Sequence, residues 1–132
     1  RDDAGCVLHL HSVNGVAVAA QEDGLLPLSQ HAIFVIGSLG VHDYEGVALE
    51  ADEKPRLVRD LGAHRHLLLR NHGLLTVGRT VAEAFVAMYL FETACTIQVR
   101  AQAGGGRLRR IPQPIVDGGD AQWDAVTRGT RG

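Results

Sequence analysis

Residues 67–83, LLLRNHGLLTVGRTVAE, carry the clearest structural pattern in the chain. The apolar run Leu67–Leu69 predicts a short buried strand, and Leu74–Val77 predicts a second one. The residues 71–73 between them, Asn-His-Gly, predict a break in the chain. Gly78 and the residue after it then predict a turn that leads into a helix. This stretch therefore predicts two adjacent strands followed by a helix.

The helix that follows begins at a recognisable cap. Thr80 is a favourable N-cap residue, and Glu83 three positions later completes the pattern of a capping box. Apolar residues on two stripes extend this helix to about Ala103, and Gly104–Gly106 ends it. The sequence predicts that the helix is buried on much of its circumference.

The elements before this unit are shorter. The first is a strand at Cys6–His11, followed by a helix that Ser12 caps and that runs to about Ala20. A second helix covers His31–Ile36; Pro27 and Ser29 open it and Gly37 ends it. A strand through Val41, a loop at His42–Gly46 and an amphipathic stretch at Glu53–Leu61 that ends at Gly62 complete this part. Such a mixture of strands and helices with short connections predicts a layered α/β domain. We assign residues 1–103 to this domain and residues 104–132 to an irregular C-terminal arm.

The composition excludes several classes of protein. An apolar fraction of 45% and a charged fraction of 21% over 132 residues are those of one ordinary soluble domain. The net charge of −2 argues against nucleic-acid binding, and the arginines after residue 99 are interpreted as a solvated tail. No apolar run approaches the roughly 18 residues of a membrane span. Cys6 and Cys95 predict two buried thiols, which favours a reducing, cytoplasmic location.

Two histidines on the first strand are the strongest candidates for a functional site. Side chains alternate along a strand, so His9 and His11 lie on one face, close enough for both imidazoles to bind one metal ion. His72 is a suitable third ligand, because Gly73 leaves room for the backbone to bend and for an ion to approach. The alternative is a pair of core histidines that bond to backbone carbonyls.

The remaining histidines carry less information. His64 and His66 form a second His-x-His pattern, which we interpret as part of a loop before the strand. His31 lies beside an apolar run and is interpreted as structural.

Two motifs resemble the class II aldolase/adducin family. They are Val7–Ser12, VLHLHS, and Leu69–Gly78, LRNHGLLTVG, and the segment Thr80–Phe85 continues the resemblance. His72 follows His11 after 61 residues, a separation close to that of the family. The resemblance covers nearly everything from Asp3 to Ala103, and two motifs at a matching separation are more specific than either alone.

The resemblance implies a layered α/β/α sandwich with a central, mostly antiparallel sheet. It implies one divalent metal ion on His9, His11 and His72, most commonly zinc, although manganese, cobalt and iron also suit three histidines. Enzymes of the family act as lyases on small hydroxy-carbonyl compounds, including sugar phosphates, through an enediolate that the ion stabilises. Relatives include decarboxylases, dehydratases, epimerases and iron oxygenases, and they commonly form tetramers. Adducins share the fold as structural proteins without this chemistry.

The sequence departs from the family before its first strand. Only eight residues precede His9, whereas family members carry a further half-domain with a phosphate-binding loop and an acid/base carboxylate. We therefore expect a truncated sheet with an exposed strand edge, which favours a homo-oligomer. The alternative to a lyase is a non-catalytic adducin-like binding module, or a truncated paralogue that retains the metal site.

Three other residues are weaker candidates for the site, and the catalytic and substrate-binding residues stay unassigned. Glu92 could support a metal-binding histidine, but we favour a surface or interface ion pair. His42 and Tyr44 could touch a substrate, but we favour an ordinary loop.

Overall fold

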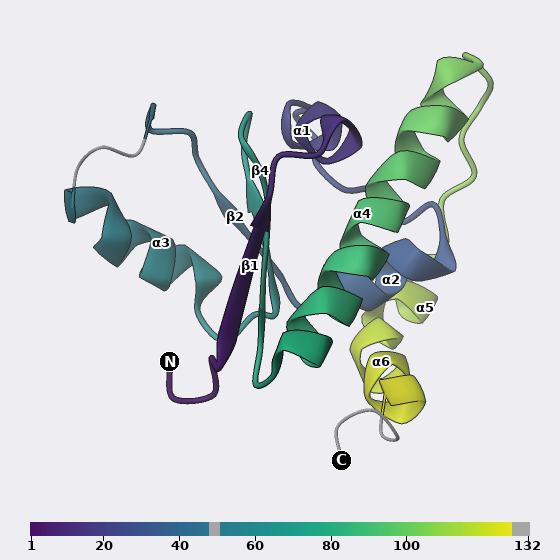
Figure 1. Cartoon of the computed structure of the whole chain (residues 1–132). Coiled ribbons are helices and arrows are strands. Elements are labelled where there is room, and N and C mark those ends of the chain that lie inside the picture. The colour runs from purple at the N-terminus through teal and green to yellow at the C-terminus, as the bar shows by residue number, and fades with distance from the viewer. Residues whose placement is uncertain (48–50, 128–132) are drawn as a thin grey trace.

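The computed structural model describes residues 1–47 and 51–127, which form a four-stranded sheet with helices on both faces (Figure 1). The spatial order of the strands is β1-β4-β3-β2. The strands are β1 (Cys6–Leu10), β2 (Leu39–His42), β3 (His66–Leu69) and β4 (Gly73–Gly78). The helices are α1 (Val13–Ala19), α2 (Gln30–Ile36), α3 (Lys54–Leu61), α4 (Val81–Ala103), α5 (Gln113–Asp117) and α6 (Gly119–Thr127), and a 3₁₀ turn at Ala51–Glu53 precedes α3.

The sheet is mostly antiparallel, as expected. β4 pairs antiparallel with both β1 and β3, whereas β2 pairs parallel with β3. Leu69 lies opposite Gly73, so β3 and β4 form a tight hairpin around the loop 70–72. Leu10 lies opposite Leu74, and His11 therefore follows β1 beside that loop. Within the described residues β1 pairs on one side only, and the side chain of Val7 is 58% exposed.

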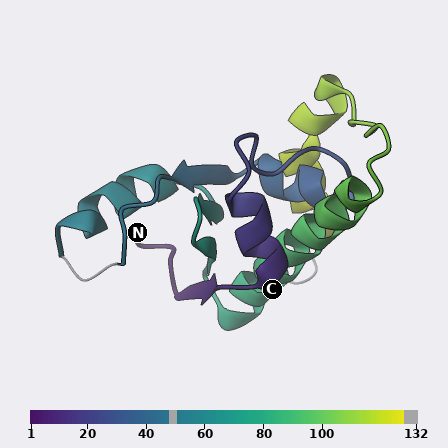
Figure 2. The same cartoon turned by 90° about the horizontal axis from the view of Figure 1, so that it is seen from above.

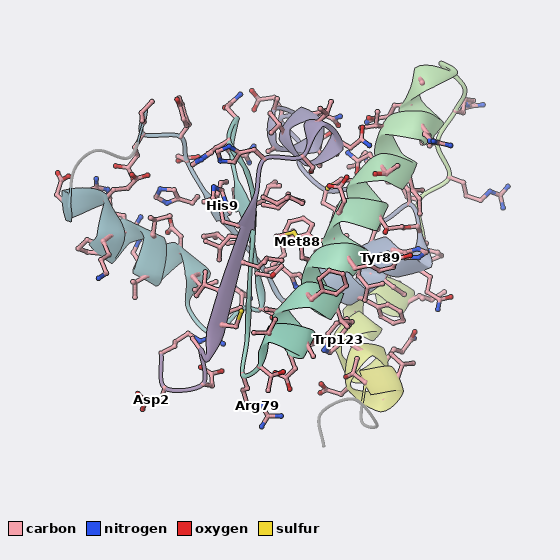
Figure 3. All side chains as sticks on the ribbon, in the orientation of Figure 1. Asp2, His9, Arg79, Met88, Tyr89 and Trp123 are labelled. Carbon is pink, nitrogen blue, oxygen red and sulfur yellow. The ribbon has the colours of Figure 1, made fainter. Side chains whose placement is uncertain are left out.

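Different helices pack on the two faces of the sheet. Leu8, Leu68 and Leu74 face α4, where they pack in one apolar cluster with Phe91 and Cys95. Helices α1 and α2 pack against α4 on this same side, and Figure 3 shows Met88 between β1 and α4. The opposite face is covered by α3, which contacts β2 and β3 (Figure 2). Leu57 of α3 and Leu75 of β4 line one cavity on that face.

The predicted helix starts are confirmed at three caps. The hydroxyls of Ser12, Ser29 and Thr80 each accept a hydrogen bond from the backbone N–H three residues later. The predicted capping box at α4 differs from the usual pattern in one bond, because Glu83 does not accept from the N–H of Thr80. Glu83 accepts from the backbone N–H of Arg79 at 2.8 Å, one residue before the cap itself.

The irregular C-terminal arm is a wrong prediction for residues 113–127, which form α5 and α6. Trp123 is 5% exposed and packs against Phe34, with ring centroids 6.3 Å apart, while the guanidinium of Arg65 lies 5.0 Å from its ring. A Cβ atom at Gly119 would lie 2.2 Å from the carbonyl oxygen of Ile33. The glycine therefore permits α6 to approach α2, and packing onto α2 stabilises helices too short to form alone. Residues 128–132 of the arm lie outside the described part.

Two other local predictions need correction. His66 begins β3 rather than lying in a loop, and it is fully buried, with its Nδ1 donating to the carbonyl of Ser38 at 3.0 Å. Helix α4 is exposed along one stripe, because Val81, Phe85 and Tyr89 are 72%, 61% and 61% exposed. Tyr89 points away from the sheet in Figure 3. The helix is therefore less buried than its apolar content predicted.

Both cysteines are free thiols, as predicted, although Cys6 is only half-buried. Burial raises the pKa of the Cys95 thiol to about 12, which leaves it protonated and unreactive at neutral pH. None of the helices in the described part of the chain is both long and apolar enough to cross a membrane.

Candidate metal centre

The side chains of His9, His11 and His72 converge at one end of the sheet. The Nε2 atoms of His9 and His11 are 2.8 Å apart, and the three ring centroids lie 4.6 to 4.9 Å from one another. One nitrogen of each ring lies within 4.8 Å of the other two. The structure thus brings together the three histidines that the sequence singled out, in an arrangement that could hold an ion.

The backbone explains how three residues from two segments meet. Residues two apart on a strand share a face, which places the rings of His9 and His11 together. Gly73 has a φ of 157°, and a Cβ atom there would lie 2.4 Å from the carbonyl oxygen of Leu10 and 3.2 Å from the His11 ring. Only glycine lets the hairpin loop come this close to β1. The close approach carries His72 to the other two rings.

A backbone hydrogen bond fixes the tautomer of His9. Its Nδ1 lies 2.9 Å from the carbonyl oxygen of Leu74, so Nδ1 carries the proton and donates it. The lone pair then resides on Nε2, which faces His11. A histidine held in this way by a backbone carbonyl is typical of metal ligands, so the donor set fits a divalent ion that accepts imidazole nitrogen.

The protonation state of His72 also suits a ligand. Burial lowers the pKa of its imidazole, and the neighbouring His9 and His11 lower it further, while Glu53 acts in the opposite direction. Only the neutral imidazole can donate a lone pair to a metal. The environment of His72 therefore favours the form that binds an ion.

The three rings open into a cavity of about 680 Å³ on the face of the sheet covered by α3. Leu57, Leu69 and Leu75 give it an apolar wall, and Tyr44 and Glu53 add polar groups. The ring of Tyr44 is centred 6.3 Å from that of His72, and its side chain is 52% exposed. Tyr44 thus lies at the mouth of the cavity, where it can reach a bound molecule.

A second polar cluster adjoins the cavity, and the sequence did not reveal it. His42, predicted to start a loop, instead ends β2 and is 4% exposed. Its Nδ1 lies 2.7 Å from a carboxylate oxygen of Asp60, and its Nε2 lies 3.1 Å from Glu45 and 3.3 Å from Glu53. Glu45 is also bonded to the guanidinium of Arg56. These partners come from separate segments, and only the packing of α3 on β2 brings them together.

The structure shows no surface ion pair for Glu92 within the described residues, and an ion pair at an interface stays a prediction. Its carboxylate accepts hydrogen bonds from the hydroxyls of Ser12 and Thr96, and no basic side chain of the described residues pairs with it. Because Ser12 follows His11 directly, these bonds fasten the end of β1 to α4.

Comparison with known proteins relates the whole chain to one family. Residues 1–99 match the Class II Aldolase and Adducin N-terminal domain. The protein named "Putative aldolase class 2 protein PA3430" of Pseudomonas aeruginosa is 49% identical over 132 residues, all of this chain and 51% of that protein. Alpha-adducin of Rattus norvegicus is 43% identical over 107 residues, 80% of this chain and 14% of that protein.

Solved structures agree with this relationship. An aldolase II superfamily protein from Pseudomonas syringae superimposes with a TM-score of 0.89 at 42% identity, over 99% of this chain and 55% of that one. L-fuculose 1-phosphate aldolase from Glaciozyma antarctica PI12 superimposes with a TM-score of 0.73 at 26% identity, over 88% of this chain and 43% of that one. The chain spans about half the length of the Pseudomonas proteins it matches. The sheet, its covering helices and the sequence match together show that the chain belongs to the class II aldolase and adducin family.

Proposed function

We propose that His9, His11 and His72 hold one divalent metal ion, and that the site performs lyase chemistry on a small hydroxy-carbonyl compound. The convergence of the three imidazoles on one cavity carries this proposal. Zinc is our first choice of metal because it binds imidazole well in three-histidine sites, and manganese, cobalt and iron suit the same ligands.

A divalent ion bound there would supply Lewis-acid chemistry, polarising a carbonyl so that an adjacent C–C or C–H bond can break. Residues of the chain would orient the metal ligands, exclude water from the cavity and bind the substrate. Leu74 fixes His9 in the tautomer that presents Nε2 to the cavity. The apolar wall formed by Leu57, Leu69 and Leu75 excludes water and strengthens electrostatic interactions inside. Tyr44 can donate a hydrogen bond to a ligand at the cavity mouth.

Sugar phosphates are the substrate class that we favour, because one structural relative is named an L-fuculose 1-phosphate aldolase. The test is incubation of the zinc-loaded chain with L-fuculose 1-phosphate, followed by assay of the dihydroxyacetone phosphate that C–C cleavage releases. Release that disappears in the His72→Ala variant supports the lyase. A zinc-loaded chain that releases nothing supports the second candidate instead.

That second candidate is a non-catalytic binding module. The 43% identity to alpha-adducin supports it, because the matched segment is a small part of a much longer protein. A module of this kind keeps the sheet and the histidines for stability, so zinc would raise its melting temperature without any turnover.

We also propose that the protein is a homo-oligomer, with a tetramer as the family-based expectation. The exposed stripe of Val81, Phe85 and Tyr89 on α4 supports this, since large exposed apolar patches commonly mark contacts between proteins. A monomer mass by light scattering at micromolar concentration would contradict it. The free thiols of Cys6 and Cys95 support a reducing compartment, and we propose the cytoplasm.

A further inference from the structure

Asn71 lies in the loop between β3 and β4, and its side chain has no role in holding that loop. Among the described residues it alone has a positive φ, of 59°, without being a glycine. Asparagine adopts this conformation more readily than most residues, because its side chain can bond to nearby backbone. The side-chain amide of Asn71 makes no hydrogen bond to any described residue, although its backbone N–H donates to the carbonyl of Ala19 at 3.0 Å. Glycine would therefore serve the backbone as well, and the amide needs another explanation.

The exposed amide of Asn71 lies where two hollows of the surface meet. Asn71 lines the cavity of about 680 Å³ that contains the three histidines. It also lines a second pocket of about 370 Å³, together with Arg70, Asp43 and residues 19–22 at the end of α1. Within the described part of the chain, Asn71 alone lines both. A ligand that extends from the histidines toward the second pocket therefore passes Asn71.

Two charged side chains that line the same hollows already have partners. The guanidinium of Arg70 donates to two backbone carbonyls at the end of α1, at 3.3 and 3.4 Å, and pairs with Asp43 at 3.6 Å. The carboxylate of Glu53 lies 3.3 Å from an imidazole nitrogen of His42. The amide of Asn71, in contrast, has two N–H donors and an acceptor oxygen available. This combination suits a hydroxyl group, which both donates and accepts a hydrogen bond.

We infer that Asn71 is a specificity-determining residue, whose side-chain amide binds the hydroxyl next to the carbonyl of a ligand held at the three histidines. This inference rests on the proposed function. The carbonyl oxygen is the atom that a metal ion polarises, so the neighbouring hydroxyl remains for a side chain to recognise. A hydroxyl that leaves water for this cavity needs a hydrogen-bond partner, because an unpaired polar group is costly there. Ligands with the hydroxyl are therefore bound more tightly than ligands without it.

The test is an NMR binding measurement on the zinc-loaded chain, with dihydroxyacetone phosphate as the probe. Selective ¹⁵N labelling of asparagine gives two side-chain amide groups, because the sequence contains only Asn14 and Asn71. Asn14 donates to the hydroxyl of Thr96 at 3.0 Å and does not line the cavity, so it is an internal control. The probe is expected to shift the signals of Asn71 and to leave those of Asn14 in place. The variant Asn14→Ala assigns the spectrum, since it retains only the amide of Asn71.

Asn71→Gly separates recognition from backbone conformation. Glycine adopts a φ of 59° without strain, so the melting temperature of the metal-free chain should stay close to that of the wild type. Zinc affinity should stay within about threefold, because no imidazole is removed. Calorimetry should show dihydroxyacetone phosphate bound about fivefold more weakly, as expected for the loss of one hydrogen bond between neutral groups. Hydroxyacetone phosphate, which lacks the hydroxyl, should bind equally well to the variant and to the wild type.

The outcomes separate this inference from the proposed function. Equal affinity of the wild type and Asn71→Gly for dihydroxyacetone phosphate, with normal zinc binding, overturns the role of Asn71 and leaves the metal function intact. Equal losses of affinity for both probes overturn it as well, because the amide then does not recognise the hydroxyl. Failure of the wild type to bind zinc overturns the proposed function and this inference with it.

The wild-type spectrum decides alone if Asn71→Gly does not fold. A shift of the Asn71 amide with dihydroxyacetone phosphate that hydroxyacetone phosphate does not produce supports the contact. Equal shifts with the two probes overturn it.

Discussion

The Nε2 atoms of His9 and His11 lie 2.8 Å apart, although different contacts hold the two rings. His9 is anchored by its Nδ1–H bond to the carbonyl of Leu74. His11 lies past the end of β1, and its ring lies over Gly73, where a Cβ atom would be 3.2 Å from it. The site thus depends on β4 and on the β3–β4 hairpin as much as on β1.

Gly73→Ala should disturb both the fold and the site. The new Cβ would meet the Leu10 carbonyl at 2.4 Å, and a φ of 157° is strained for any residue with a side chain. Backbone strain of this kind costs about 1–3 kcal/mol of unfolding free energy. Chemical denaturation measures the loss, and zinc titration should show weaker binding. Gly104→Ala is the matched control, because its φ is −79° and a Cβ there would meet no atom within 4 Å, and it should leave zinc affinity unchanged.

Stability should fall in acid because of His66. Burial lowers the pKa of its imidazole to about 4, below the ordinary value of 6.5. The unfolded chain therefore binds a proton at a pH where the folded chain does not. The free energy of unfolding should drop by about 3 kcal/mol as the pH falls from 6.5 to 4, and this contribution should then level off.

His66→Asn should flatten that dependence in denaturation curves recorded between pH 7 and pH 4. His64→Asn changes an exposed histidine two residues earlier and should leave the curve as it is. Equal slopes for the wild type and His66→Asn would show that other groups cause the acid sensitivity.

Much of the fold follows from local signals. Ser12, Ser29 and Thr80 predicted three helix starts correctly. Each N-cap side chain accepts a hydrogen bond from a backbone N–H only three residues later, so the pattern can be found in a short stretch of sequence. Strand alternation pairs His9 with His11, whereas His72 was added from its neighbour Gly73 and from the resemblance to the family. Local patterns of this kind can be recognised without a structure.

Contacts between distant segments could not be predicted in the same way. Asp60 reaches His42 only because β2 pairs with β3 and α3 packs on β2. Helix α6 is similar, since Trp123 is stabilised by Phe34 and Arg65 from other elements. The sequence predicted an irregular arm for these residues, whereas Gly119 lets α6 pack closely on α2.

Ser12→Ala should weaken the junction of β1 and α1. The hydroxyl caps α1 through the N–H of Gly15 and also donates to Glu92. Loss of an N-cap costs about 1 kcal/mol of unfolding free energy, and loss of the hydrogen bond to one carboxylate oxygen of Glu92 adds to this. Ser12→Asp provides the contrast: aspartate is a good cap, but its charge would face Glu92, so this variant should gain nothing over alanine. A double-mutant cycle with Glu92→Gln measures the coupling.

Elemental analysis of the purified, zinc-dialysed chain tests most directly whether the three histidines hold one metal ion. The wild type and the His64→Ala control should each retain about one zinc per chain. His9→Ala, His11→Ala and His72→Ala should each retain less than about a tenth of that, because two imidazoles alone bind weakly. Zinc content that is unchanged in all three variants would contradict the account.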